Sequence, residues 1–113
     1  QGQGGHDPLA PIRRSFLSHL ADRCLAIDAI LERDDGRGIT AEERDLIIHH
    51  THKTAGIAAS LGYEDLGRLA GDVESAWVHM PSGHVDVTPD PVLEVTRRFL
   101  DEIERVLDED LVA

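Results

Sequence analysis

The sequence contains few aromatic residues and one cysteine, and each shortage excludes a class of structure. Aromatic residues make up 4% of the chain. A core with few aromatic residues and no β-branched runs favours helices over strands. The single cysteine, Cys24, excludes an internal disulfide and a zinc site built from cysteines. Because its neighbours in the sequence are apolar, we expect Cys24 to be a small buried residue rather than a reactive thiol.

Positive charge and long apolar runs are also scarce. Lys and Arg total 11 against 22 Asp and Glu, which gives a formal net charge of -11. Such a charge repels nucleic acids and anionic membranes, so we expect neither as a partner, and it would attract a basic protein surface. No apolar run approaches the length of a membrane span, and no signal peptide precedes the first helix. We therefore expect a cytoplasmic protein.

The 113 residues are enough for one domain. We expect residues 1–6 to be a flexible tail or an expression scar, and residues 7–113 to form the domain. Apolar residues recur every three or four positions in four segments, which predicts four amphipathic helices. These helices cover about residues 8–33, 40–62, 63–78 and 90–108. With mostly short connections, they predict an all-α fold, an antiparallel four-helix up-down bundle.

The expected inward faces and helix ends follow from the same pattern. Asp7 and Pro8 are a capping pair for the first helix, Thr40 and Glu43 form a capping box for the second, and Gly62 ends it. The predicted inward residues are, in chain order, Leu9, Ile12, Phe16, Leu20, Cys24, Ile27 and Leu31, then Ile47, Thr51, Thr54, Ala58 and Leu61, then Leu66, Leu69, Ala70, Val73, Ala76 and Trp77, and finally Val92, Thr96, Phe99, Ile103 and Val106.

The second helix contains the residues most suggestive of chemistry. If Thr51 and Thr54 face the core, His52 faces solvent. Its helical neighbours are then Ile48, His49, Ala55 and Gly56. A neutral imidazole is a usable nucleophile near neutral pH, and small neighbours leave room for a reacting partner. Together with Ala59, the apolar neighbours could form a dry docking patch.

The segment from His52 to Gly62, HKTAGIAASLG, resembles the signature of histidine-phosphotransfer (HPt) domains. The glycine four residues after the histidine and the Leu61-Gly62 pair are in register with His52, not with His49 or His50. The resemblance implies an HPt-like bundle of bacterial two-component signalling, with His52 as phosphoacceptor. It implies receiver domains of response regulators and hybrid histidine kinases as partners. The receiver domains would dock on, and reach His52 past, the following residues: Ile48, His49, Lys53, Ala55, Gly56 and Ala59.

Two positions depart from that signature. Thr54 stands where the family has leucine, and Ala55 stands where the family has a lysine beside the phosphoryl group. Lys53 lies about 100° away around the helix and is a poor substitute. We expect no cofactor in the protein itself, with Mg²⁺ held by the partner receiver domain, because partners can supply the metal and the cation for phosphoryl transfer.

Other functions remain open at this level. The bundle could be a docking module that binds a receiver or kinase domain without being phosphorylated, as the missing lysine suggests. His49 and His52 share a helix face, so a metal-binding bundle is a third possibility, although Glu-x-x-His motifs are missing. No metal site is predicted. No glycine-rich phosphate loop is present, so we expect no autokinase activity. We expect a monomer and a half-buried His50.

Overall fold

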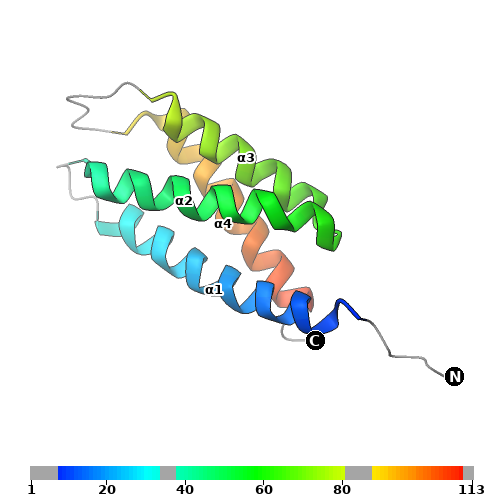
Figure 1. The fold of residues 1–113 in the computed structure, drawn as a ribbon. Coiled ribbons are helices and arrows are strands. Elements are labelled where there is room, and N and C mark those ends of the chain that lie inside the picture. The colour runs from blue at the N-terminus through cyan, green and yellow to red at the C-terminus, as the bar shows by residue number, and fades with distance from the viewer. Residues whose placement is uncertain (1–7, 34–37, 81–87, 111–113) are drawn as a thin grey trace, which may run out of the picture.

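The computed structural model describes residues 8–33, 38–80 and 88–110, which over these ranges form helices and no strand (Figure 1). The elements are α1 (Ala10–Arg33), α2 (Ala41–Ala58), a short 3-10 helix η1 (Ala59–Leu61), α3 (Glu64–Val78) and α4 (Asp90–Asp110). Successive helices run in opposite directions, and α4 crosses behind the other three (Figure 1). The predicted all-α up-down bundle is confirmed. The expected tail and the Asp7 cap lie outside the described residues.

The start of α2 and the link to α3 follow the local sequence signals. The Glu43 amide donates to the Thr40 Oγ1 atom at 3.1 Å, and the Thr40 amide donates to Glu43 Oε1 at 2.9 Å, so both halves of the capping box are present. At the other end, Gly62 has a φ of 94°, a left-handed conformation that glycine adopts without strain. The chain therefore reverses within two residues, and α3 returns alongside α2.

The core fills the space between the four helices and is largely the one predicted. Its buried apolar residues are Phe16, Leu17, Leu20, Ile27, Ile30, Leu31, Ile47, Ala58, Leu61, Leu66, Ala70, Val73, Trp77, Phe99, Leu100, Ile103 and Val106. The prediction for α1 is wrong at two positions, because Leu9 and Ile12 are 40% and 50% exposed. Leu17 and Ile30 are buried instead. For Ile12 the reason is that α1 packs more closely on α4 than on α2, which leaves this side chain in an open groove between α1 and α2.

The buried polar side chains that the structure describes all have hydrogen-bond partners. Thr51, Thr54 and Thr96 are buried, and each hydroxyl donates to the backbone carbonyl four residues earlier. The indole Nε1 of Trp77 donates to Thr96 Oγ1 at 2.9 Å. Among the described residues, no buried side-chain nitrogen or oxygen lacks a hydrogen bond. Since an unpaired buried polar atom costs about 1–3 kcal/mol, these bonds let threonines occupy core positions.

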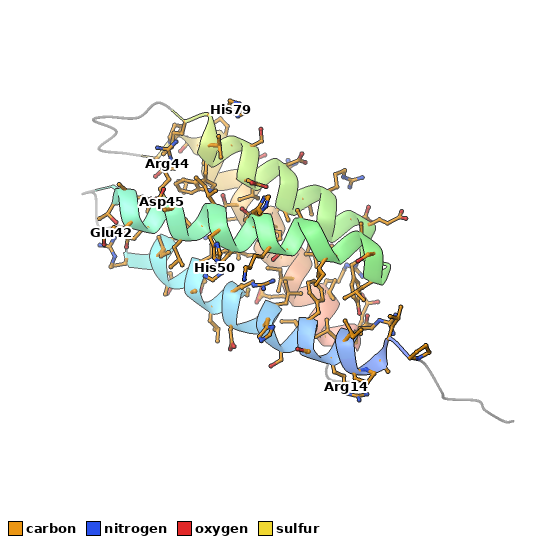
Figure 2. The ribbon with its side chains drawn as sticks, in the orientation of Figure 1. Arg14, Glu42, Arg44, Asp45, His50 and His79 are labelled. Atoms are coloured by element: carbon orange, nitrogen blue, oxygen red, sulfur yellow. The ribbon has the colours of Figure 1, made fainter. Side chains whose placement is uncertain are left out.

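Helices α2 and α3 make the most extensive contact in the bundle. Arg44, near the start of α2, lies beside the last turn of α3 (Figure 2). Its guanidinium donates to the carbonyl of Trp77 at 2.9 Å and to that of Val78 at 3.0 Å. These carbonyls have no partner within their own helix, so Arg44 acts as a cap supplied by the neighbouring helix.

Cys24 is half-buried beside α4 rather than fully buried. Burial raises the pKa of its thiol to about 11, and the nearby carboxylates of Glu104, Asp28 and Asp101 act in the same direction. The thiolate is the reactive form of cysteine, so this thiol is protonated and unreactive at neutral pH. Within the described ranges, no helix is both long and apolar enough to cross a membrane.

Candidate functional site

His52 lies on the solvent-facing side of α2, as predicted, and its side chain is 75% exposed. The imidazole Nδ1 lies 2.9 Å from Oε2 of Glu74, which projects from α3. The Glu74 side chain is less accessible, at 27% exposed. The site therefore joins two helices: α2 presents the imidazole, and α3 holds one edge of its ring.

The contact with Glu74 determines which imidazole nitrogen can react. An ionised carboxylate only accepts hydrogen bonds, so Nδ1 must be the donor and must hold a proton. In the neutral ring, Nε2 is then left with the free lone pair. Because Glu74 engages Nδ1, Nε2 is on the opposite edge of the ring, away from α3. The arrangement produces an oriented nitrogen nucleophile on an exposed helix surface.

Sequence reasoning missed Glu74, although a signal for it was present. His52 and Glu74 are 22 residues apart, and Tyr63, in the tight turn after Gly62, lies midway between them in the sequence. Two antiparallel helices joined by a tight turn bring residues equidistant from that turn side by side. An acidic residue placed symmetrically to a candidate histidine was therefore a predictable partner.

Some of the predicted neighbours of His52 pack against the core, and others are exposed to solvent. Ile48 and Ala55 are half-buried and pack against the core. Ala59 lies in η1 and is exposed, and so is Gly56, one turn after His52. A Cβ atom added to Gly56 would meet nothing within 4 Å. A glycine inside a helix costs about 1 kcal/mol of stability relative to alanine. Packing within this chain does not explain why a glycine occupies position 56. The glycine leaves open space beside His52.

His49 and Lys53, two of the predicted docking positions, are exposed and belong to the side of α2 that faces α1. With His50 and three residues of α1, they line a depression of about 320 Å³; the α1 residues are His19, Asp22 and Arg23. His50 is half-buried here, as expected, and points toward α1 (Figure 2). Burial lowers the pKa of His50, and the charges of Arg23, His49 and Lys53 lower it further. His50 is therefore neutral at physiological pH, and the depression owes its positive charge to Arg23 and Lys53.

Within the described residues, the histidines of α2 do not form a metal site with other side chains. No cluster of three or more His, Cys, Asp or Glu side chains suited to a metal ion occurs in the part of the chain that the structure describes. A durable transition-metal site usually needs three or four protein ligands. His49 and His52 therefore gain no third ligand from the described residues.

Comparison with known proteins gives one match. The family model described as "Hpt domain" matches residues 11–109, from the first turn of α1 to the last turn of α4. No curated protein and no solved structure matches the chain. The match covers the His52–Glu74 pair and both helices that hold it.

Proposed function

The chain belongs to the Hpt domain family, a family of phosphorelay modules, and we propose that it relays a phosphoryl group between receiver domains through a phosphohistidine at His52. The observation that supports this role best is the exposed imidazole whose Nδ1 is held by Glu74 at 2.9 Å. It leaves Nε2 as the nucleophile. The partners are receiver domains of response regulators and hybrid histidine kinases.

In the proposed transfer, the Nε2 lone pair attacks the phosphorus of an aspartyl phosphate on the first receiver. The Nε2–P bond forms, and the bond between phosphorus and the aspartyl oxygen breaks. The aspartate leaves as a carboxylate with the bonding electron pair. The proton on Nδ1 stays in place, and Glu74 stabilises the positive charge that develops on the phosphorylated ring. Donation to the second receiver reverses these steps, with neutral imidazole as the leaving group.

The charge of the transferring group must be neutralised mainly by the partner. Ala55 replaces the lysine that the family places beside the phosphoryl group, and Lys53 points to another side of α2. Phosphoryl transfer depends largely on positioning and on charge neutralisation, which a receiver and its Mg²⁺ can supply. In this proposal, the protein contributes an oriented nitrogen, and the open space at Gly56 gives the partner access to it.

The test is phosphoryl transfer from a panel of phosphorylated receiver domains to the wild type and to His52→Gln. We expect an acid-labile, base-stable label on the wild type and none on the variant. His79→Gln is the matched control, because His79 is an exposed histidine at the end of α3, outside the site. Labelling of His52→Gln at the wild-type rate would show that another residue is the acceptor.

A second function is favoured by Ala55 alone: a docking module that binds receivers without being phosphorylated. It predicts receiver binding that survives His52→Ala, and no label on the wild type from any receiver. Direct labelling with phosphoramidate separates the two functions. Its P–N bond breaks, ammonia leaves, and the phosphoryl group bonds to His52 without a docked protein. A label that is present on the wild type and absent from His52→Gln would contradict the docking-only function.

A further inference from the structure

The depression of about 320 Å³ between α1 and α2 is not used by the proposed transfer chemistry. Its lining side chains come from two facing helices: His19, Asp22 and Arg23 from α1, and His49, His50 and Lys53 from α2. With neutral histidines, Arg23 and Lys53 outweigh Asp22 by one charge, and each protonated imidazole adds another. The whole chain has a net charge of -11. Positive charge gathered at one place on an acidic protein indicates a site for an anion.

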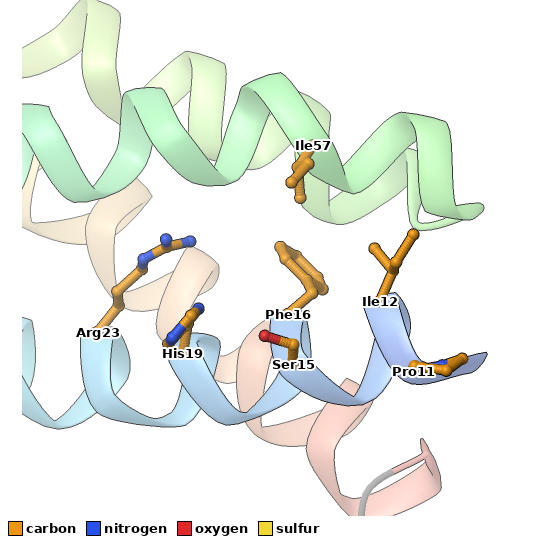
Figure 3. A pocket seen from close by; sticks show the side chains of 7 residues that line it. All are labelled: Pro11, Ile12, Ser15, Phe16, His19, Arg23 and Ile57. Carbon is orange, nitrogen blue, oxygen red and sulfur yellow. The ribbon is translucent and has the colours of Figure 1, made fainter. Parts of the chain in front are cut away.

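The helical spacing of these residues directs them into the same space. His19 and Arg23 are four residues apart on α1, as His49 and Lys53 are on α2, so each pair lies on one side of its helix. Figure 3 shows Arg23 extending into the space between the helices, one turn after His19. The ring centroids of His49 and His50 are 6.0 Å apart. Hydrogen-bond donors from both helices therefore line one space.

Arg23 is the strongest donor of the depression, and most of its donors are unused. It is half-buried and donates one hydrogen bond, to Thr54 Oγ1 at 3.2 Å, which holds the guanidinium against α2. No carboxylate of the residues that the structure describes forms an ion pair with it. A guanidinium has five N–H donors, in a fork that matches two oxygens of a phosphate group. Because a half-buried cation without a counter-ion is destabilising, an anion on Arg23 would stabilise the folded protein.

His50 links the occupancy of the depression to a proton. Burial lowers the pKa of His50, and the charges of Arg23, His49 and Lys53 lower it further. The other groups that face this space are His19 and Asp22 of α1. A bound dianion opposes the effect of the cations, because a negative charge favours the protonated imidazole. Binding of a dianion would therefore take up a proton, and the protonated ring has an additional N–H donor.

We propose that the depression binds a tetrahedral dianion, the phosphate group of a small soluble molecule. Arg23 and Lys53 bind its oxygens from opposite walls, and the protonated ring of His50 is a third donor. Donors on two walls suit an anion whose oxygens point in several directions, whereas a carboxylate presents two oxygens in one plane. No covalent bond forms or breaks at this site, and His52 does not line it.

The first probe is sulfate, a tetrahedral dianion whose charge is constant near neutral pH. Sodium sulfate is titrated into the protein at constant ionic strength, set with sodium chloride, and NMR follows the imidazole signals. We expect saturable shifts of the His50 signals and none for His79, which is exposed at the end of α3. The affinity should increase as the pH falls through the pKa of His50. Sulfate should raise that pKa to a matching extent, because the two effects are linked.

Two variants remove one positive charge from each wall. We expect Arg23→Gln to weaken sulfate binding at least about tenfold, as loss of a hydrogen bond to a charged group does, and Lys53→Gln to weaken it about threefold. Arg14→Gln is the control, at an exposed arginine of α1 outside the depression, and should change the affinity less than about twofold. Circular dichroism checks each fold. Lys53 is exposed and has no hydrogen bond or ion pair to the other described residues, so its replacement does not disturb packing.

Inorganic phosphate and glycerol 3-phosphate are then compared, to separate a free ion from a phosphate monoester. Tighter binding of glycerol 3-phosphate would support a monoester as the ligand, and equal binding would support the free ion. Equal losses in Arg23→Gln and Arg14→Gln, or His50 shifts that chloride alone reproduces, would overturn the proposal. Loss of sulfate binding in His52→Gln would also overturn it, because the anion would then lie at His52. Retained binding in that variant keeps this site independent of the proposed phosphohistidine.

Discussion

At the scale of single residues, one hydrogen bond orients the His52 side chain. An exposed imidazole alone exchanges between two tautomers and several rotamers, and only some of them present Nε2 to a partner. The Glu74 carboxylate at 2.9 Å from Nδ1 favours one tautomer and one ring orientation. Because the His52 side chain is 75% exposed, little else restrains it, and the carboxylate becomes its main positioning group.

We expect Glu74→Gln to slow phosphorylation of His52 without unfolding the protein. Glutamine keeps the size of the side chain but loses the charge, and its amide can also donate to Nδ1, which favours the wrong tautomer. The loss of an orienting partner of this kind costs about 10- to 100-fold in rate. The measurement is the rate of phosphoramidate labelling, followed by ³¹P NMR. Glu64→Gln, an exposed glutamate in the first turn of α3, is the control, and equal rates for the two variants would remove Glu74 from the mechanism.

Individual residues were predictable from sequence to different degrees. The spacing between His52, Gly56 and the Leu61-Gly62 pair identified the histidine that Glu74 engages, because that motif is local. Leu9 and Ile12 were wrongly placed in the core. Periodicity tells which residues share a face, and it does not tell how far a neighbouring helix covers that face.

At the scale of elements, the start of α2 combines two interactions on one side chain. Glu43 closes the capping box with Thr40 and forms an ion pair with Arg33 at the end of α1. The hydrogen bond from Arg33 is the largest cause of a lowered pKa at Glu43, followed by the bond from the Thr40 amide. A carboxylate whose pKa is lower in the folded state than in the unfolded state stabilises the fold at neutral pH. That contribution disappears as the pH falls through the folded pKa.

We therefore expect Glu43→Gln to lower the free energy of unfolding at pH 7, by an amount that shrinks as the pH falls through the folded pKa of Glu43. Below that pKa the wild-type carboxyl is protonated and has lost the same contribution. Thr40→Ala should cost about 1 kcal/mol at pH 7, as loss of a helix cap does. Urea denaturation at pH 7 and at a series of lower pH values measures these differences. Glu42→Gln, one residue away on an exposed position, should be close to neutral, and a loss of stability in that variant equal to the loss in Glu43→Gln would contradict the role of Glu43.

The ends of helices were predictable from sequence where the residues that cap or stop the helix lie within one turn of that end. The capping box at Thr40 and the stop at Gly62 depend on residues within one turn, and both appear in the structure as expected. The cap that Arg44 supplies to α3 was not predictable in this way. It joins residues more than thirty positions apart and depends on how α2 and α3 pack.

At the scale of the whole molecule, the four helices pack against one another to different extents. α2 and α3 share the most extensive contact, whereas α1 meets α2 over the smallest one among the main helix pairs. Leu9, just before α1, and Ile12, in its first turn, are exposed. Local stability in a folded protein follows the density of such contacts.

We expect amide hydrogen exchange to be fastest, among the helices, in the N-terminal half of α1 and slowest in α2 and α3. Mass spectrometry of peptic fragments would resolve these segments. Equal protection of α1 and α3 in the free protein would contradict the packing order of the helices.

The position of His52 and Glu74 in one helical hairpin has a consequence for how such a protein can change over generations. The proposed nucleophile, the carboxylate that orients it and the turn that aligns them occupy one short stretch of chain, from α2 to α3. Substitutions outside that stretch leave the pair and its turn in place, so the other helices can diverge while this geometry is kept. The hairpin is therefore the segment to transplant when the proposed reactivity is to be moved to another bundle.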